Sequence, residues 1–135
     1  MEANIVILPG DGIGAEVVAE AQRVLDSIAS IFGHSFAFEH HLFGGSAMDH
    51  GLEPLPKETR DACLSANAVL LGAVGSPKWD DLTAKARPEN ATLELRTELG
   101  VYANLRPIPV YPELIEVTPF KPQHLSGVDL VIIRE

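Results

Sequence analysis

The chain contains little that would support several common classes of protein. Its single cysteine, Cys63, excludes a disulfide within the chain and a zinc site built from several cysteines. Lysine and arginine number 10 against 19 aspartates and glutamates, which gives a net charge of −9. Nucleic acids and anionic membranes require clustered basic side chains on their partners. We therefore expect no nucleic acid and no membrane as a partner.

Long hydrophobic runs are also missing. No apolar stretch approaches the ~20 residues that cross a bilayer, and the N-terminus lacks the basic segment and apolar run of a secretory signal. Aromatic residues make up only 6% of the 135 residues, but 46% are hydrophobic, which is enough to bury a real core. The simplest expectation is a soluble, cytoplasmic, globular protein.

Short apolar segments alternate with helical patterns along the chain. The β-branched run 4–8 stops at Pro9-Gly10 and predicts a buried strand, and apolar residues then recur at helical spacing as far as Phe32. By the same criteria, strands are expected at 35–42, 68–72, 101–106 and 128–133, helices at 56–66 and 91–99, and loops at 44–55, 76–90 and 107–127. The last strand, 128–133, is expected to be buried. Strands alternating with helices predict an α/β layered fold with a mostly parallel sheet and flanking helices.

A glycine-rich turn, Gly10-Asp11-Gly12-Ile13-Gly14, joins the first strand to the first helix. Such a turn lets backbone N–H groups approach a phosphate or a carboxylate. Its spacing is G-x-G-x-G, whereas a Rossmann dinucleotide fold has G-x-G-x-x-G. Taken alone, the turn fits a tight strand-to-helix connection better than a ligand site.

Three arginines, Arg96, Arg106 and Arg134, lie among apolar neighbours. Arg96 shares a helix face with Thr92, and Arg134 ends an apolar strand, where parallel sheets usually bind ligands. Converging guanidinium groups would suit a dicarboxylate, because each can hold a carboxylate bidentately. The alternative is that the three arginines are unrelated and lie at the surface or in ion pairs. For any one arginine taken by itself, this alternative is the better interpretation.

The segment Ser76-Pro77-Lys78-Trp79-Asp80 follows an apolar strand. Two interpretations stay open: the segment closes over a ligand, or Trp79 anchors a loop to the body of the protein. The histidines show neither metal-ligand spacing nor a neighbouring nucleophile, and Cys63 fits a small core residue. These side chains thus indicate neither a nucleophile nor a metal site.

Four ordered motifs resemble one enzyme family, the β-decarboxylating dehydrogenases that act on isocitrate and isopropylmalate. They are LPGDGIGAEV, LLGAVGSPKWDDL, ARPENATLELRTELGVYANLRP and GVDLVIIRE, and the second and third are similar to the 3-isopropylmalate dehydrogenases in particular. The resemblance runs from about Asn4 to Glu135. It implies that residues 1–100 form the N-terminal part of an NAD-binding α/β domain that is not a Rossmann domain. Residues 101–135 would then enter a second, truncated domain for substrate binding and dimerisation.

The resemblance implies NAD-dependent oxidation of 3-isopropylmalate and loss of its β-carboxylate, aided by Mg²⁺ or Mn²⁺, in leucine biosynthesis by a homodimer. It implies that Arg96, Arg106 and Arg134 bind the carboxylates of this 2-hydroxy dicarboxylic acid. Thr92 and Leu93 stand where the family usually has two leucines against the isopropyl group. That departure leaves homoisocitrate, tartrate or D-malate as alternative substrates.

The cofactor site follows from the same resemblance. The loop from Ser76 to Glu89 would lie along the NAD, with Glu89 near the nicotinamide and Ile13 near the adenosine. The implied NAD-binding residues are therefore Ile13, Ser76, Pro77, Lys78, Trp79, Asp80 and Glu89.

The family's catalytic and metal-binding residues lie beyond the length of this chain. We therefore expect an incomplete domain, an N-terminal fragment that is inactive by itself and whose metal ligands lie outside it. A noncatalytic nucleotide-binding module resting on the GDGIG turn is the alternative from another class.

Overall fold

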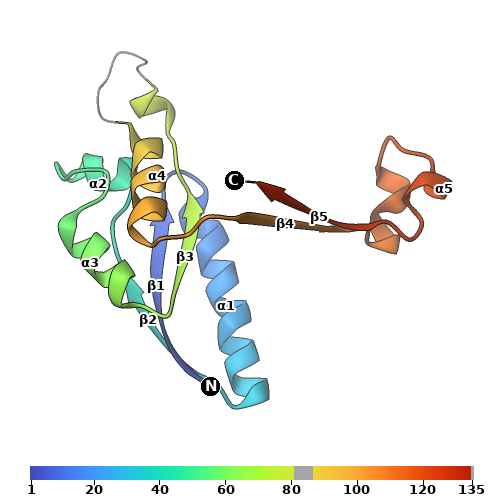
Figure 1. Cartoon of the computed structure of the whole chain (residues 1–135), viewed down its shortest axis with the longest axis horizontal. Coiled ribbons are helices and arrows are strands. Elements are labelled where there is room, and N and C mark those ends of the chain that lie inside the picture. Colours follow the sequence, from blue (N-terminus) through green and yellow to red (C-terminus); the bar gives the residue numbers. More distant parts are fainter. Residues whose placement is uncertain (81–86, 135) are drawn as a thin grey trace. The chain divides into compact units, whose positions relative to one another are not determined.

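The computed structural model describes residues 1–80 and 87–134. They divide into two compact units, Met1–Gly100 and Val101–Glu135. The first unit contains, in chain order, β1 (Glu2–Gly10), α1 (Gly14–Phe32), β2 (Ser35–His40), α2 (Gly45–Asp49), α3 (Lys57–Ser65), β3 (Ala68–Ala73), the 3₁₀ turn η1 (Pro77–Trp79) and α4 (Pro88–Glu98) (Figure 1). None of the described helices is both long and apolar enough to span a bilayer.

The first unit is built on a three-stranded parallel sheet in the order β2-β1-β3. Side chains of β1 alternate between its two faces. Ile5 and Ile7 pack with Val18 of α1, whereas Val6 and Leu8 pack with Phe43 and with residues of α3 and α4. Helices therefore cover both faces of the sheet (Figure 1), and the predicted α/β layered fold is confirmed.

Two helices of this unit differ from the sequence prediction. The glycine-rich stretch after β2, expected to be a loop, contains the short helix α2, whose first N–H groups are held by the Asp11 carboxylate. The helix expected at 91–99 begins earlier, at Pro88. Proline suits the first helical position because its fixed φ is already helical and its missing N–H has no partner there.

The second unit contains β4 (Asn104–Pro109), the 3₁₀ turn η2 (Pro112–Val117), α5 (Pro122–Leu125) and β5 (Asp129–Arg134). The two strands pair antiparallel, with Asn104 opposite Arg134 and Pro109 opposite Asp129. The strand expected at 101–106 is therefore displaced and runs into the proline-rich stretch expected to be a loop. Proline is tolerated there because each strand of a two-stranded ladder has a free edge that needs no N–H donor.

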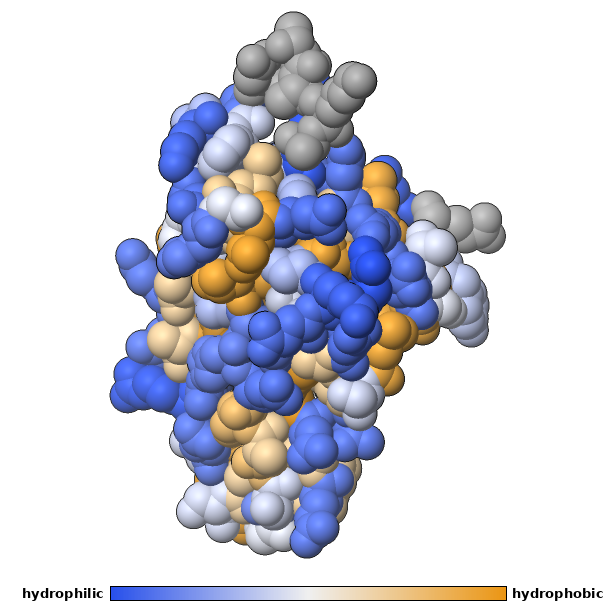
Figure 2. Space-filling model, turned by 90° about the vertical axis from the view of Figure 1, so that its left-hand side faces the viewer, coloured by the Kyte–Doolittle hydropathy of each residue, from blue (hydrophilic) through white to orange (hydrophobic). Residues whose placement is uncertain are grey.

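The prediction that the last strand is buried is wrong. In β5, Val131 and Ile133 are 54% and 67% exposed. Over the described residues 101–134 no side chain is buried. An apolar strand becomes buried only where a second layer covers it, and the described part of this unit supplies none. By contrast, polar side chains cover much of the α2 and α3 side shown in Figure 2, with hydrophobic patches between them.

Candidate functional site

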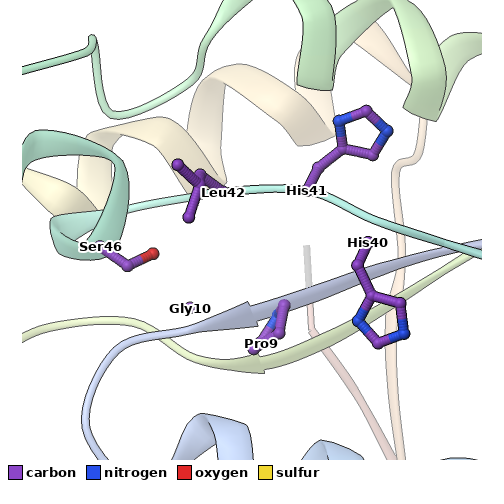
Figure 3. A pocket seen from close by; sticks show the side chains of 6 residues that line it. All are labelled: Pro9, Gly10, His40, His41, Leu42 and Ser46. Carbon is purple, nitrogen blue, oxygen red and sulfur yellow. The ribbon is translucent and has the colours of Figure 1, made fainter. Parts of the chain in front are cut away.

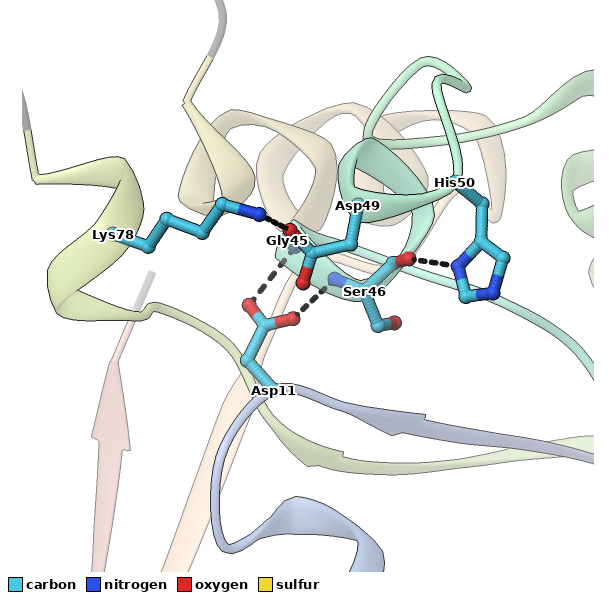
Figure 4. Close-up of polar contacts among 6 residues, drawn as sticks. All are labelled: Asp11, Gly45, Ser46, Asp49, His50 and Lys78. Atoms are coloured by element: carbon cyan, nitrogen blue, oxygen red, sulfur yellow. Dashed lines mark hydrogen bonds and ion pairs between the residues drawn. The ribbon is translucent and has the colours of Figure 1, made fainter.

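A buried carboxylate joins three loops at the carboxyl end of the parallel sheet. Asp11, in the turn after β1, is only 5% exposed. Its Oδ1 accepts the Ser46 N–H at 2.7 Å, and its Oδ2 accepts the Gly45 N–H at 3.0 Å (Figure 4). Oδ2 also accepts the Gly75 N–H at 2.8 Å. Its own N–H donates to the Ala73 carbonyl at 2.7 Å. Ligands of parallel α/β sheets bind at this end of the strands.

Glycine is required at two positions around this carboxylate. A Cβ at Gly45 would lie 3.0 Å from Asp11 Oδ1 and 2.8 Å from Trp79 Cδ1. Gly75 has a φ of +114°, and a Cβ there would lie 2.9 Å from Glu89 Oε1. Side chains thus approach the backbone of both loops more closely than any other residue type would permit. The turn after β1 and these two loops therefore form a close-packed loop junction around Asp11.

The segment Ser76–Asp80 leaves this junction directly. Lys78 forms an ion pair with Asp49 of α2 and lies 5.0 Å from the centre of the Trp79 ring. Trp79 is half-buried against Gly45, which agrees with an anchoring role, and its buried Nε1 has no hydrogen-bond partner among the described residues. Pro77, Lys78 and Asp80 are exposed. The expected NAD-binding loop continues through residues 81–86, which lie outside the described residues.

The other expected NAD residues lie at the same end of the sheet. Ile13 is 63% exposed at the start of α1, two residues after Asp11. Glu89 is in the first turn of α4, with its carboxylate over Gly75. The structure thus brings Ile13, Ser76 and Glu89 to one edge of the unit. Contact with NAD stays a prediction.

One face of α4 carries the expected substrate residues of the first unit. Glu89 precedes Thr92 and Leu93 by three and four residues, and Arg96 follows them by four and three. This spacing aligns the four residues along one side of a helix. Thr92 is half-buried, whereas Arg96 is exposed and Leu93 is 62% exposed. This face therefore presents one guanidinium beside an alkyl and a hydroxyl side chain.

The second unit carries the other two expected substrate arginines. Because Asn104 is opposite Arg134 and Arg106 is two residues further along β4, Arg106 and Arg134 lie on the same face of the ladder as diagonal neighbours. Both side chains are exposed, and Arg106 Nε donates to Asn104 Oδ1 at 3.4 Å. Two guanidinium groups therefore share one face of the ladder, and their contact with a carboxylate stays a prediction.

A pocket of about 260 Å³ lies beside the ends of β1 and β2 (Figure 3). Its lining consists of Pro9, Gly10, His40, His41, Leu42 and Ser46, none of which the sequence singled out as a site residue. His41 Nε2 lies 2.8 Å from Glu39 Oε1, so this imidazole has a structural partner.

Among residues 1–80 and 87–134, the remaining thiol, carboxylate and imidazole groups form no metal-binding cluster. Burial, and secondarily the charge of Glu39, raises the pKa of the Cys63 thiol to about 11, so this cysteine is a protonated core residue at neutral pH. In the described part of the chain, no three histidine, cysteine or acidic side chains are grouped as metal ligands.

Comparison with known protein families gives one match over nearly the whole chain. The model of the isocitrate/isopropylmalate dehydrogenase family matches residues 4–135. The chain therefore belongs to the isocitrate/isopropylmalate dehydrogenase family, as its four motifs predicted.

Individual members of this family show which enzymes the chain resembles in sequence. The 3-isopropylmalate dehydrogenases of Rhodopirellula baltica and Anaeromyxobacter dehalogenans are 51% and 54% identical to this chain, over 100% of it. The chain spans 38% of the length of each of these relatives. The solved isocitrate dehydrogenase of Methylococcus capsulatus is 31% identical, with a TM-score of 0.74 over 98% of this chain and 34% of its own.

Sequence reasoning missed the role of Asp11. Its signal was present, since an aspartate between two glycines ends the first strand and a second glycine pair, Gly44-Gly45, follows the second strand. Only the folded chain shows that these two glycine-rich segments meet at one carboxylate.

Proposed function

We propose that this chain forms part of an NAD-dependent dehydrogenase that oxidises 3-isopropylmalate and releases its β-carboxylate as CO₂, in leucine biosynthesis. The similarity of the whole chain to enzymes named 3-isopropylmalate dehydrogenase supports this proposal. The structural observation that carries it is the placement of Arg106 and Arg134 on one face of the β4–β5 ladder. A noncatalytic nucleotide-binding module would not require that pairing.

The two units would have different tasks in this enzyme. In the proposal, residues 1–100 are the N-terminal part of the NAD-binding domain, and residues 101–135 enter the domain for substrate binding and dimerisation. The carboxyl end of the parallel sheet, with Ile13, Ser76 and Glu89, supports NAD binding by the first unit. We further propose a cytoplasmic homodimer.

The residues of this chain would bind and orient rather than transfer protons. Arg96, Arg106 and Arg134 would hold the carboxylates of the malate group, each as a charge-assisted pair that fixes the direction of the substrate. NAD, when bound, would supply the group that accepts a hydride from the substrate carbon that carries the hydroxyl. We also propose, as the resemblance to the family implies, that the ligands of the Mg²⁺ or Mn²⁺ lie outside this chain.

The arginine assignment is tested by Arg106→Ala in the complete enzyme. Removing one partner of a desolvated charge pair costs about 2–5 kcal/mol, so kcat/KM for isopropylmalate falls by ~30-fold or more while NAD binding is retained. Arg23→Ala is the matched control, because Arg23 pairs with Glu20 on the exposed side of α1 and is 75% exposed itself. Near-normal kinetics of Arg106→Ala would contradict the assignment.

The position of Thr92 gives a test of the substrate. A change of one methylene-sized group in an apolar pocket alters discrimination by about 1–3 kcal/mol. Thr92→Leu is therefore expected to raise the preference for isopropylmalate over D-malate by ~10-fold, measured as the ratio of the two kcat/KM values. Thr97→Leu, on the same helix, is the control. An unchanged ratio in Thr92→Leu would show that this side chain does not face the alkyl group.

A further inference from the structure

One carboxylate of the first unit, that of Asp11, has no part in the proposed substrate site but joins several segments of the backbone. Asp11 is 5% exposed and accepts three backbone N–H groups from two loops that follow β2 and β3. Three N–H donors aimed at two oxygens require a group that only accepts, and among side chains an ionised carboxylate meets that requirement. Hydrogen bonds to an ionised acceptor are also stronger than neutral ones.

These bonds connect α2 to the segment expected to bind NAD. Gly45 and Ser46 begin α2, and Gly75 immediately precedes Ser76. Two weaker contacts link the same parts. One is the exposed Lys78–Asp49 ion pair (Figure 4), and the other is the packing of Trp79 on Gly45. Exposed ion pairs add little rigidity, so the buried carboxylate is the principal link.

We infer that Asp11 is a positioning residue that fixes the backbone of Ser76–Asp80 against α2 and so presets the cofactor-binding segment. The NAD part of this inference rests on the proposed function. The backbone part rests on the hydrogen bonds alone and is testable without NAD.

The backbone part is tested in the 135-residue chain, where Trp79 is the only tryptophan and so reports on this segment. Asp11→Asn places an NH₂ against at least one N–H donor in either orientation of the amide. The acrylamide quenching constant of Trp79 is expected to rise at least twofold, with the circular dichroism spectrum retained. Asp11→Glu keeps the charge but moves the carboxylate, and is expected to behave like Asp11→Asn. Asp26→Asn, on the exposed side of α1, is the matched control.

A second variant covers the case in which Asp11→Asn does not fold. Gly45→Ala keeps the carboxylate but places a Cβ 3.0 Å from it and 2.8 Å from Trp79 Cδ1. It is expected to raise the quenching constant as well. Unchanged quenching in Gly45→Ala, or in a folded Asp11→Asn, or normal quenching in Asp11→Glu, overturns the positioning role.

The NAD part is tested in the complete enzyme. With Asp11→Asn, KM for NAD is expected to rise at least tenfold while KM for isopropylmalate changes less than twofold. A merely structural role would change both or lower only the amount of folded enzyme. Equal changes in both KM values would overturn the inference, whereas an unmutated enzyme that does not reduce NAD would overturn the proposed function and leave the quenching result standing.

Discussion

The strands β1 and β5 consist of the same kinds of apolar residue, but the apolar side chains of β1 are buried and those of β5 are exposed. In β1, Ile7 and Leu8 are 0% exposed, whereas Ile132 and Ile133 in β5 are 47% and 67% exposed. β1 is the central strand of a three-stranded sheet with helices on both faces, whereas β5 pairs, among the described strands, only with β4. An apolar, β-branched run therefore specifies a strand, but the neighbouring layers decide whether the strand is buried.

The same contrast extends to the two units. Residues 1–100 hold both clusters of buried apolar side chains, and residues 101–134 hold no buried side chain. The second unit is thus maintained by ladder and turn hydrogen bonds, with apolar side chains such as Leu105 and Tyr111 exposed. Exposed apolar faces and free sheet edges favour association with further polypeptide.

Identical substitutions in the two strands give the largest expected difference. Ile7→Ala removes a fully buried side chain and is expected to lower the free energy of unfolding by about 2–5 kcal/mol. Ile133→Ala removes an exposed one and is expected to change it by less than about 0.5 kcal/mol. Urea unfolding of the 135-residue chain, followed by circular dichroism, measures both. Equal losses would mean that the burial contrast between β1 and β5 is wrong.

A matched pair of threonines sharpens the comparison at the level of single hydrogen bonds. Thr59, in the first unit, is 2% exposed, and its hydroxyl donates to the Leu42 carbonyl at 2.9 Å. Thr118, in the second unit, is half-buried, and its hydroxyl donates to the Ile115 carbonyl at 3.1 Å. Thr59→Val removes the hydroxyl of a buried side chain and leaves the Leu42 carbonyl without this donor, and is expected to cost about 1–3 kcal/mol.

Thr118→Val is the control for this experiment. Water can replace the lost donor in the second unit, so the expected loss is below about 0.5 kcal/mol. Both values come from the same urea titrations. A loss in Thr118→Val as large as that in Thr59→Val would indicate a buried core in the second unit.

The reactivity of Cys63 gives the smallest effect, because it reports a difference in protonation rather than a lost contact. Burial, followed by the charge of Glu39, raises the pKa of its thiol from 9.0 to about 11. Protonation is favoured in the folded chain, so this stabilisation is present below pH 9 and is lost as the pH rises towards 11. Alkylation by iodoacetamide, measured by mass spectrometry at pH 8 to 10, is expected to be slower in the folded chain than in urea. Equal rates at pH 8 would show that Cys63 is not held in the core.

The family and the layered fold were predictable, because they depend on local patterns. The strand at 4–8, the helix that follows it and the strand at 68–72 all formed within two residues of their expected bounds. The site was predictable only in part. The spacing along α4 aligns Thr92, Leu93 and Arg96. That Arg106 and Arg134 are neighbours, however, depends on the antiparallel register of β4 and β5, which neither strand specifies by itself.

The sequence by itself determined which segments are strands and helices, since side-chain period, proline and glycine act on the nearest few residues. The tertiary structure decided the rest. It determined that Ile7 is buried and Ile133 exposed, and that Asp11 binds loops 34 and 64 residues further along the chain. Burial and long-range hydrogen bonds depend on which elements meet in space, and that meeting is a property of the whole fold rather than of any short segment.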